Sequence, residues 1–172
     1  MGTVKPKKNQ LNALDLLVMQ HDQVEELISQ LEEDDLEVDK KRVLFRELAD
    51  NVAAHATMEE QIFYPAIRAK QTEEILLEST EEHLAIRRVL ADLLETDLDD
   101  PRFEARLSVL KEQIEHHARE EEEKELFPKL RRLMPAEELD ALGSEMLALF
   151  ERLMTQDPRL EVPKQTDKPA RV

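Results

Sequence analysis

The sequence is short of several residue types that common functional classes need. It has no cysteine and no tryptophan, two glycines and a single tyrosine. Without cysteine the chain has no disulfides, thiolate nucleophiles or thiolate metal ligands, so any metal must bind to nitrogen and oxygen atoms. Strand-like alternation and long apolar runs are also missing, which argues against a sheet-rich fold and against a membrane span.

Charge is the second constraint on function. The 172 residues carry a net charge of −16, and 37% of them are charged. This acidic excess disfavours binding to nucleic acid or to an anionic membrane surface, because both repel negative charge. The first ten residues are basic and polar but lack the apolar core of a signal peptide, so we expect a cytoplasmic protein.

Long segments rich in leucine, glutamate, alanine, arginine and lysine indicate an all-α protein. Pro65 and Pro128 are expected to interrupt two of its helices. We expect a flexible arm at residues 1–11, a helical domain at 12–155 and a disordered tail at 156–172, where proline and charge predominate. Apolar residues recur every three or four positions, which predicts helices over residues 12–33, 39–70, 72–96, 101–133 and, as a short fifth helix, 135–154.

An internal repeat relates the two halves of the chain. A constant 62 residues separates His21 from His83, His55 from His117, and Glu59 from Glu121. A helical hairpin used twice predicts an up-down-up-down four-helix bundle with a pseudo-twofold axis, followed by the fifth helix. The two prolines are one residue out of step with this offset. The slip predicts one extra residue, such as a π-bulge, after the repeated glutamates.

Histidine and glutamate stand four residues apart at corresponding places in the two halves. On a helix this spacing puts both side chains on one face, where an imidazole nitrogen and a carboxylate oxygen can meet at a metal ion. A bare carboxylate in an apolar bundle is costly, and a dication offsets that cost, although a salt bridge to lysine or arginine could also do so. The predicted ligands of a two-metal centre are His21, His55, Glu59, His83, His117 and Glu121.

One ligand position has two candidates. Either Glu121 or Glu122 can be the metal ligand of the second half. Glu122 lies on the same helix face as the leucines that follow it, whereas the register of the repeat favours Glu121. His116 points about 100° away from His117 on a regular helix, so we expect it outside the ligands or at the surface.

Three further residues lie near the predicted ligands. Glu25 and Arg87 occupy corresponding positions, one turn after the first and third histidines, and we expect them to pair across the bundle. Tyr64, just before a proline, is expected to be a packing residue.

The motifs resemble those of the hemerythrin-like, or HHE cation-binding, domains. The resemblance covers about residues 12–155 and implies a non-haem centre of two iron ions joined by an oxo or hydroxo group. It also implies histidines as terminal ligands, with Glu59 and either Glu121 or Glu122 as bridges. Nitrogen and oxygen ligands also suit manganese or zinc, and the resemblance favours iron. The matching motifs are His21-Asp22, His55-x-x-x-Glu59-Glu60 with Tyr64-Pro65, His83, and His117-x-x-x-Glu121-Glu122 with Phe127-Pro128.

One departure affects the expected function. The oxygen-carrying hemerythrins have two histidines one turn apart on the third helix, whereas the residues four positions from His83 are Ser79 and Arg87. The missing imidazole leaves an open coordination position, whose polarity Ser79, Arg87 or His116 would set. We expect a small ligand, O2, NO or H2O2, in a binding or sensing role. The alternatives are catalase-like disproportionation of H2O2, and iron storage or delivery. We expect the protein to be a monomer or a weak homodimer.

Overall fold

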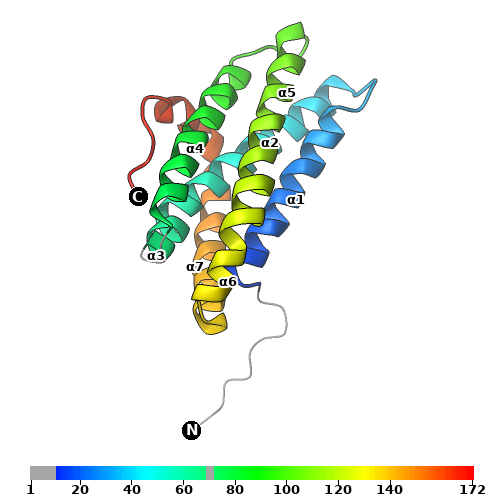
Figure 1. Cartoon of the computed structure of the whole chain (residues 1–172). Helices are drawn as coiled ribbons and strands as arrows, with labels where there is room; N and C mark the ends of the chain where they lie inside the picture. Colours follow the sequence, from blue (N-terminus) through cyan, green and yellow to red (C-terminus); the bar gives the residue numbers. More distant parts are fainter. Residues whose placement is uncertain (1–10, 69–71) are drawn as a thin grey trace.

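The helices begin and end close to the predicted positions. The computed structural model describes residues 11–68 and 72–172, and all regular structure in these ranges is helical (Figure 1). The arm predicted for residues 1–11 therefore lies outside the described residues, except for Leu11. The elements are α1 (Ala13–Leu31), α2 (Val38–Met58), the π-helix η1 (Glu59–Phe63), α3 (Tyr64–Ile67), α4 (Glu73–Leu94), α5 (Pro101–Glu115), the π-helix η3 (His116–Leu126), α6 (Phe127–Leu133), α7 (Ala136–Met154) and the 3-10 helix η4 (Pro158–Gln165).

Side-chain caps fix the starts of two bundle helices. The Asn12 side chain accepts a hydrogen bond of 2.9 Å from the backbone N–H of Asp15 at the start of α1. Asp100 does the same for the N–H of Arg102, also at 2.9 Å, and a proline occupies the first turn of α5. These caps satisfy N–H groups that have no partner inside the helix. Both helix starts were predicted from the sequence.

The two helices that carry the histidine–glutamate pairs widen into π-helices. The backbone N–H of Tyr64 bonds to the carbonyl of Glu59, and that of Phe127 bonds to the carbonyl of Glu122. Bonds to the fifth preceding residue define a π-helix, and such segments are frequent at functional sites. The sequence predicted one bulge, in the second half only. The structure has π-helices in both halves, but η3 extends over 11 residues and η1 over five.

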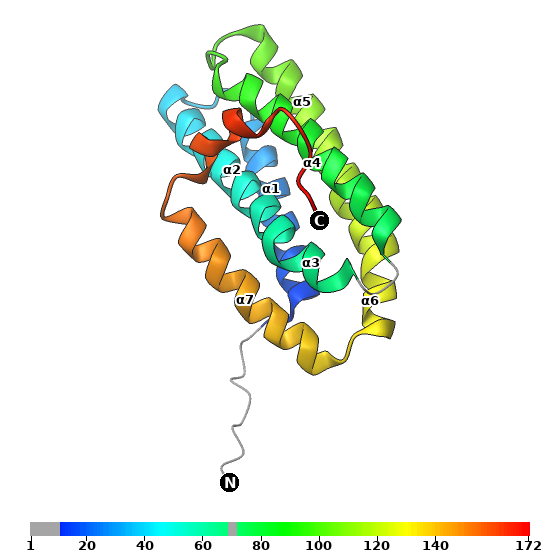
Figure 2. The same ribbon diagram turned by 90° about the vertical axis from the view of Figure 1, so that its left-hand side faces the viewer.

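Two antiparallel hairpins form the bundle, in the predicted up-down-up-down order (Figure 1). α1 packs against α2, and α4 packs against α5 and η3. α7 lies on the outside of the bundle against α1 and α2 (Figure 2), and its 19 residues make it as long as α1. None of the helices formed by the described residues combines the length and apolar character that crossing a bilayer requires.

The C-terminal segment is ordered where a disordered tail was predicted. η4 packs against α2 and α4, and Val162 within it is fully buried in the core. The backbone N–H and the guanidinium of Arg159 donate to the Asp50 carboxylate at 3.0 and 2.7 Å. The prediction of disorder therefore does not hold over residues 158–165. One buried valine and one tertiary ion pair outweigh the local richness in proline and charge.

The apolar core has two clusters with a polar layer between them. One cluster lies toward the loop that joins α1 to α2, and the other lies toward α3 and α6, where α7 also packs. The histidine positions fall between the two clusters along each bundle helix. Core packing therefore holds the polar layer from both sides. Representative members are Val24, Leu48, Leu90 and Leu110 of the first cluster, and Leu14, Ile67, Phe127 and Met146 of the second.

Docking of the C-terminal segment can be tested with two substitutions on η4. Val162→Asp places a charge in the core and should lower the free energy of unfolding by about 2 kcal/mol or more. Leu160→Asp, at a position that is 60% exposed, should change it by less than about 0.5 kcal/mol. Urea unfolding followed by circular dichroism measures both. Equal effects of the two substitutions would show that η4 is not part of the folded core.

Candidate metal centre

Four imidazoles and two carboxylates meet in the polar layer. His21 comes from α1, His55 from α2, His83 from α4, and His117 from η3. Glu59 of η1 and Glu122 of η3 complete the group, and both are completely buried. Ionised carboxylates are rarely left fully buried without positive partners, so this layer needs an explanation beyond packing.

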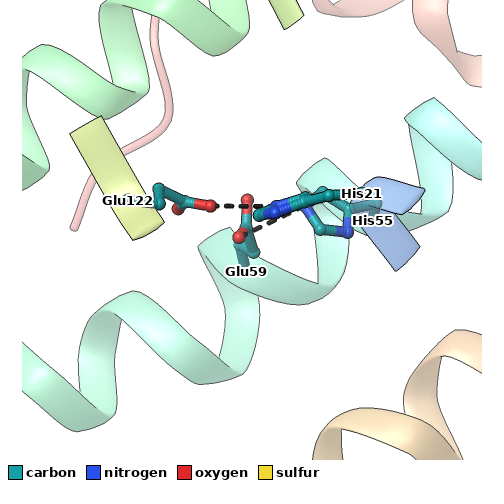
Figure 3. Close-up of side chains that lie close together, drawn as sticks. All are labelled: His21, His55, Glu59 and Glu122. Carbon is teal, nitrogen blue, oxygen red and sulfur yellow. Dashed lines mark ion pairs between the residues drawn. The ribbon is translucent and has the colours of Figure 1, made fainter. Parts of the chain in front are cut away.

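The ligand atoms form two groups that share the carboxylates. In the first, His21 Nε2 lies 3.2 Å from Glu122 Oε2, and His55 Nε2 lies 3.3 Å from Glu59 Oε1 (Figure 3). In the second, His83 Nε2 lies 3.1 Å from Glu59 Oε2, and His117 Nε2 lies 3.6 Å from Glu122 Oε1. Each glutamate thus faces one histidine pair with one oxygen and the other pair with its second oxygen. This arrangement is suited to carboxylates that bridge two cations.

The outward-facing nitrogen of every imidazole in the centre has an oxygen partner. A carboxylate or amide oxygen can only accept, so each Nδ1 donates its proton, and in the neutral imidazole the lone pair of Nε2 is directed at the centre. The partners are related by the pseudo-twofold axis, because they occupy corresponding positions in the two halves. The Nδ1 distances are 2.7 Å from His21 to Glu123, 2.7 Å from His55 to Gln20, 2.9 Å from His83 to Glu60, and 2.6 Å from His117 to Glu82.

The centre therefore contains acceptors that face other acceptors. Three of its buried atoms, His21 Nε2, Glu59 Oε1 and Glu122 Oε2, have no hydrogen-bond partner among the described residues. A cation placed between these atoms would satisfy them and would balance the charge of the carboxylates. The donor set fits a metal that binds nitrogen and oxygen.

The titration behaviour of the same residues reflects this demand for positive charge. Burial lowers the pKa of His21, but the carboxylates of Glu122 and Glu123 beside its two ring nitrogens outweigh burial and raise it to about 9. Burial raises the pKa of Glu59, but the neighbouring imidazoles, His55 foremost, hold it well below its usual range. Protons on the histidines and metal cations thus compete for the same place.

Tyr64 contributes a hydroxyl to the centre, although it was expected only to pack. Its oxygen lies 3.1 Å from Glu122 Oε1, 3.2 Å from His83 Nε2 and 3.3 Å from Glu59 Oε2. Burial and then the two negative glutamates raise the pKa of Tyr64 well above its usual range. A signal was present in the sequence, because the corresponding residue of the second half is Phe127, which has no hydroxyl.

The structure brings Glu122, and not Glu121, next to the other five predicted residues. Five positions separate His117 from Glu122, whereas four separate His55 from Glu59, so the extra residue of the second half lies between histidine and glutamate. It does not lie after the glutamates, as the register of the repeat suggested. The wider turn of η3 directs Glu122 inward.

Glu121 lies outside the central group. Its Oε1 is 3.6 Å from Nε2 of His116, which is at the rim and largely exposed. Burial and the nearby Glu82 carboxylate raise the pKa of Glu121 to about 8. His116 therefore lies at the rim, outside the group of four imidazoles and two carboxylates.

The predicted pair between Glu25 and Arg87 is not formed. Arg87 donates to both oxygens of Glu60 at 2.6 and 2.9 Å, and Glu25 accepts from Arg119 at 2.8 and 2.7 Å. Arg87 thus neutralises Glu60, which orients His83. Arg119 also donates to Glu123, which orients His21. Ser79 is fully buried on α4, one turn before His83.

A cavity of about 30 Å³ adjoins the four imidazoles. About 10–15 Å³ on this measure suffices for one water molecule, so a diatomic molecule also fits. Most of the other lining residues are aliphatic, and they form pairs that the 62-residue repeat relates. The cavity therefore lies near the pseudo-twofold axis. Its aliphatic residues are Val24 and Ile86, Val52 and Ile114, and Ala56 and Ala118.

Comparisons with known proteins agree with this geometry. A family model described as the hemerythrin HHE cation-binding domain matches residues 12–130. The crystal structure of a hemerythrin HHE cation-binding domain-containing protein from Mycobacterium kansasii superimposes with a TM-score of 0.76 at 25% identity, over 91% of this chain and 94% of that one. An uncharacterized protein of Mycobacterium tuberculosis is 28% identical over 83% of this chain and 88% of its own length.

A relative from Nostoc, named DNA nickase, is 26% identical over 82% of this chain. The match covers 40% of that protein, so this chain spans about two fifths of its length.

Paired substitutions distinguish the two adjacent glutamates. Glu122→Gln should lower tightly bound metal by about half or more, because it removes an oxygen that faces both histidine pairs. Glu121→Gln should leave tightly bound metal unchanged after full reconstitution and desalting. Metal analysis per folded chain, with circular dichroism as the control for folding, decides between them. The reverse result would favour the register of the repeat over the arrangement described above.

Proposed function

This chain belongs to the hemerythrin HHE cation-binding family, and we propose that its buried centre holds two iron ions and binds O2, NO or H2O2. The observation that supports the proposal most strongly is the position of the two carboxylates, each of which faces both histidine pairs. Two cations, one beside each histidine pair, would satisfy the buried ligand atoms that have no hydrogen-bond partner in the described part of the chain. The absence of sulfur ligands suits iron, manganese or zinc, and the family favours iron.

The proposed ligands divide into two sets. His21 and His55 would hold one ion and His83 and His117 the other, with Glu59 and Glu122 bridging them. The Tyr64 oxygen lies closest to the second set, at 3.2 Å from His83 Nε2. Iron, when bound, supplies reversible one-electron chemistry and an open position for a small ligand.

The surroundings of the centre determine what can reach it. The cavity beside the imidazoles is lined mostly by aliphatic side chains and has room for a small molecule. Besides the imidazoles, Gln20 is the polar residue of this lining. The oxygens that hold the four Nδ1 protons fix the direction in which each imidazole points. A pocket this small, with imidazoles in fixed orientations, favours binding of a diatomic gas or of peroxide over hydrolysis of a larger substrate.

Disproportionation of two H2O2 molecules to O2 and two water molecules is a second candidate function. It is favoured by the Tyr64 hydroxyl, which lies within 3.1 to 3.4 Å of four acceptors in the centre and can donate its hydrogen to a peroxide bound beside them. Iron storage is not supported, because a cavity of about 30 Å³ has no room for a mineral core. We also do not extend the nickase activity of the Nostoc relative to this chain, whose net charge of −16 opposes DNA binding.

Filling the cavity tests the proposed ligand pocket. Ala118→Val adds two methyl groups to the lining and should weaken NO binding to the reduced, iron-loaded protein by about tenfold or more, because the added atoms occupy the ligand's place. The matched control is Ala141→Val on the exposed face of α7. Anaerobic NO titration followed by visible absorption measures affinity. Unchanged NO affinity in Ala118→Val at unchanged iron content would place the ligand elsewhere.

Removal of one oxygen atom separates the two candidate functions. If the centre disproportionates peroxide, Tyr64→Phe should lower O2 evolution from H2O2 by about tenfold or more, because a proton donor is lost. NO affinity should then stay within about twofold of the wild type. An oxygen electrode provides the measurement. The absence of O2 evolution by the iron-loaded wild type would remove the second candidate and leave the first.

A further inference from the structure

The four oxygens that hold the Nδ1 protons differ in how their charge is balanced. Gln20 is neutral. Glu60 is held by both arms of the Arg87 guanidinium, at 2.6 and 2.9 Å. Glu123 accepts from Arg119 at 2.6 Å. Three of the four positions are therefore already neutral or neutralised, and a cation from solvent gains little by approaching them.

Glu82 is the exception. Its Oε2 lies 2.6 Å from His117 Nδ1, and its Oε1 lies 3.3 Å from the Nε2 of His116. Within residues 11–68 and 72–172 it forms no ion pair with lysine or arginine. On η3 it also lies next to another carboxylate, Glu121.

Glu121 adds a second carboxylate at the same place, and one of its oxygens has no hydrogen-bond partner within the ranges that the structure describes. The residue is only 8% exposed, and its Oε2 is buried without a hydrogen-bond partner. One ligand atom from each of Glu82, His116 and Glu121 lies within 4.8 Å of the other two. Two carboxylates and an imidazole at this separation are a donor set for a divalent cation.

The repeat shows that the bundle does not need this group in order to fold. At the corresponding positions of the first half, Gln20 takes the place of Glu82 and Ala54 takes the place of His116. The first half therefore has the same helix pair and the same imidazole orientation without the extra acid and histidine. A purely structural role would be expected in both halves.

From these observations we propose that Glu82, His116 and Glu121 form an outer site for a divalent cation, through which the central site is loaded. His116 is 60% exposed and can take a hydrated cation from solvent. Glu82 is shared between this site and His117, so a cation bound here is one residue away from the centre. The loading role rests on the proposed function, whereas the outer site does not.

Titration with Co²⁺ tests the outer site. We would fill the centre of the full-length protein with iron, desalt it, and measure added Co²⁺ by equilibrium dialysis while iron content is monitored. The wild type should bind one further Co²⁺ per chain. His116→Ala and Glu121→Gln should weaken that binding by about tenfold or more, because each removes one ligand. The absence of saturable Co²⁺ binding by the wild type, or equal binding by both variants, would overturn the site.

The matched control is Glu120→Gln. Glu120 is exposed and pairs with Lys124. Its substitution by glutamine removes the same charge from the same helix as Glu121→Gln does. The variant should bind Co²⁺ like the wild type. Equal weakening in Glu120→Gln would mean that Co²⁺ responds to the general negative potential of η3, and would also overturn the site.

The loading role is tested by the rate of Fe²⁺ uptake under anaerobic conditions. The metal-free His116→Ala protein should take up iron about fivefold or more slowly than the wild type and reach the same final content. Equal rates would overturn the loading role. If neither protein takes up iron at the centre, the proposed function and the loading role both fail. Co²⁺ binding by the wild type and by His116→Ala, compared without prior iron loading, then decides whether the outer site exists.

Discussion

The structure depends on one electrostatic constraint, the burial of six acceptor groups that face one another. Four imidazole nitrogens present lone pairs inward because their outer nitrogens donate to oxygens, and Glu59 and Glu122 have no exposed surface. Among the described residues, a hydroxyl from Tyr64 is the one neutral donor within reach of several of them. Positive charge must enter this layer, and the two apolar clusters hold the layer in place until it does.

The internal repeat explains both the symmetry of the centre and its asymmetry. The imidazoles, the two central glutamates and the oxygens behind the imidazoles all occur in pairs related by the repeat. The surroundings of the pairs differ, because the second histidine pair has Tyr64, Ser79 and Glu82 nearby, where the first has Phe127, Leu17 and Gln20. The surroundings of the two halves are therefore chemically different. The half-site of His83 and His117 is therefore the more polar and the more acidic of the two.

Much of the fold followed from the sequence because it rests on local rules. The spacing of apolar residues located the bundle helices, and Asn12 and Asp100 cap two of them through contacts within three residues. The assignment of Glu121 over Glu122 rested on a constant 3.6-residue turn, which the π-helix η3 does not have. Tyr64 looked like a packing residue because its ring does pack; only the tertiary structure places its hydroxyl.

The order of the C-terminal segment and the partners of Arg87 also depended on tertiary contacts. Arg159 pairs with Asp50, which is 109 positions away in the chain, and Arg87 pairs with Glu60 instead of Glu25. No local pattern contains that information.

Anomalous diffraction from crystals of the iron-loaded protein, recorded at the iron absorption edge, tests the central claim most directly. The account predicts two peaks, one beside His21 and His55 and one beside His83 and His117, with Glu59 and Glu122 between them. A single peak, or water molecules alone among the four imidazoles, would contradict it.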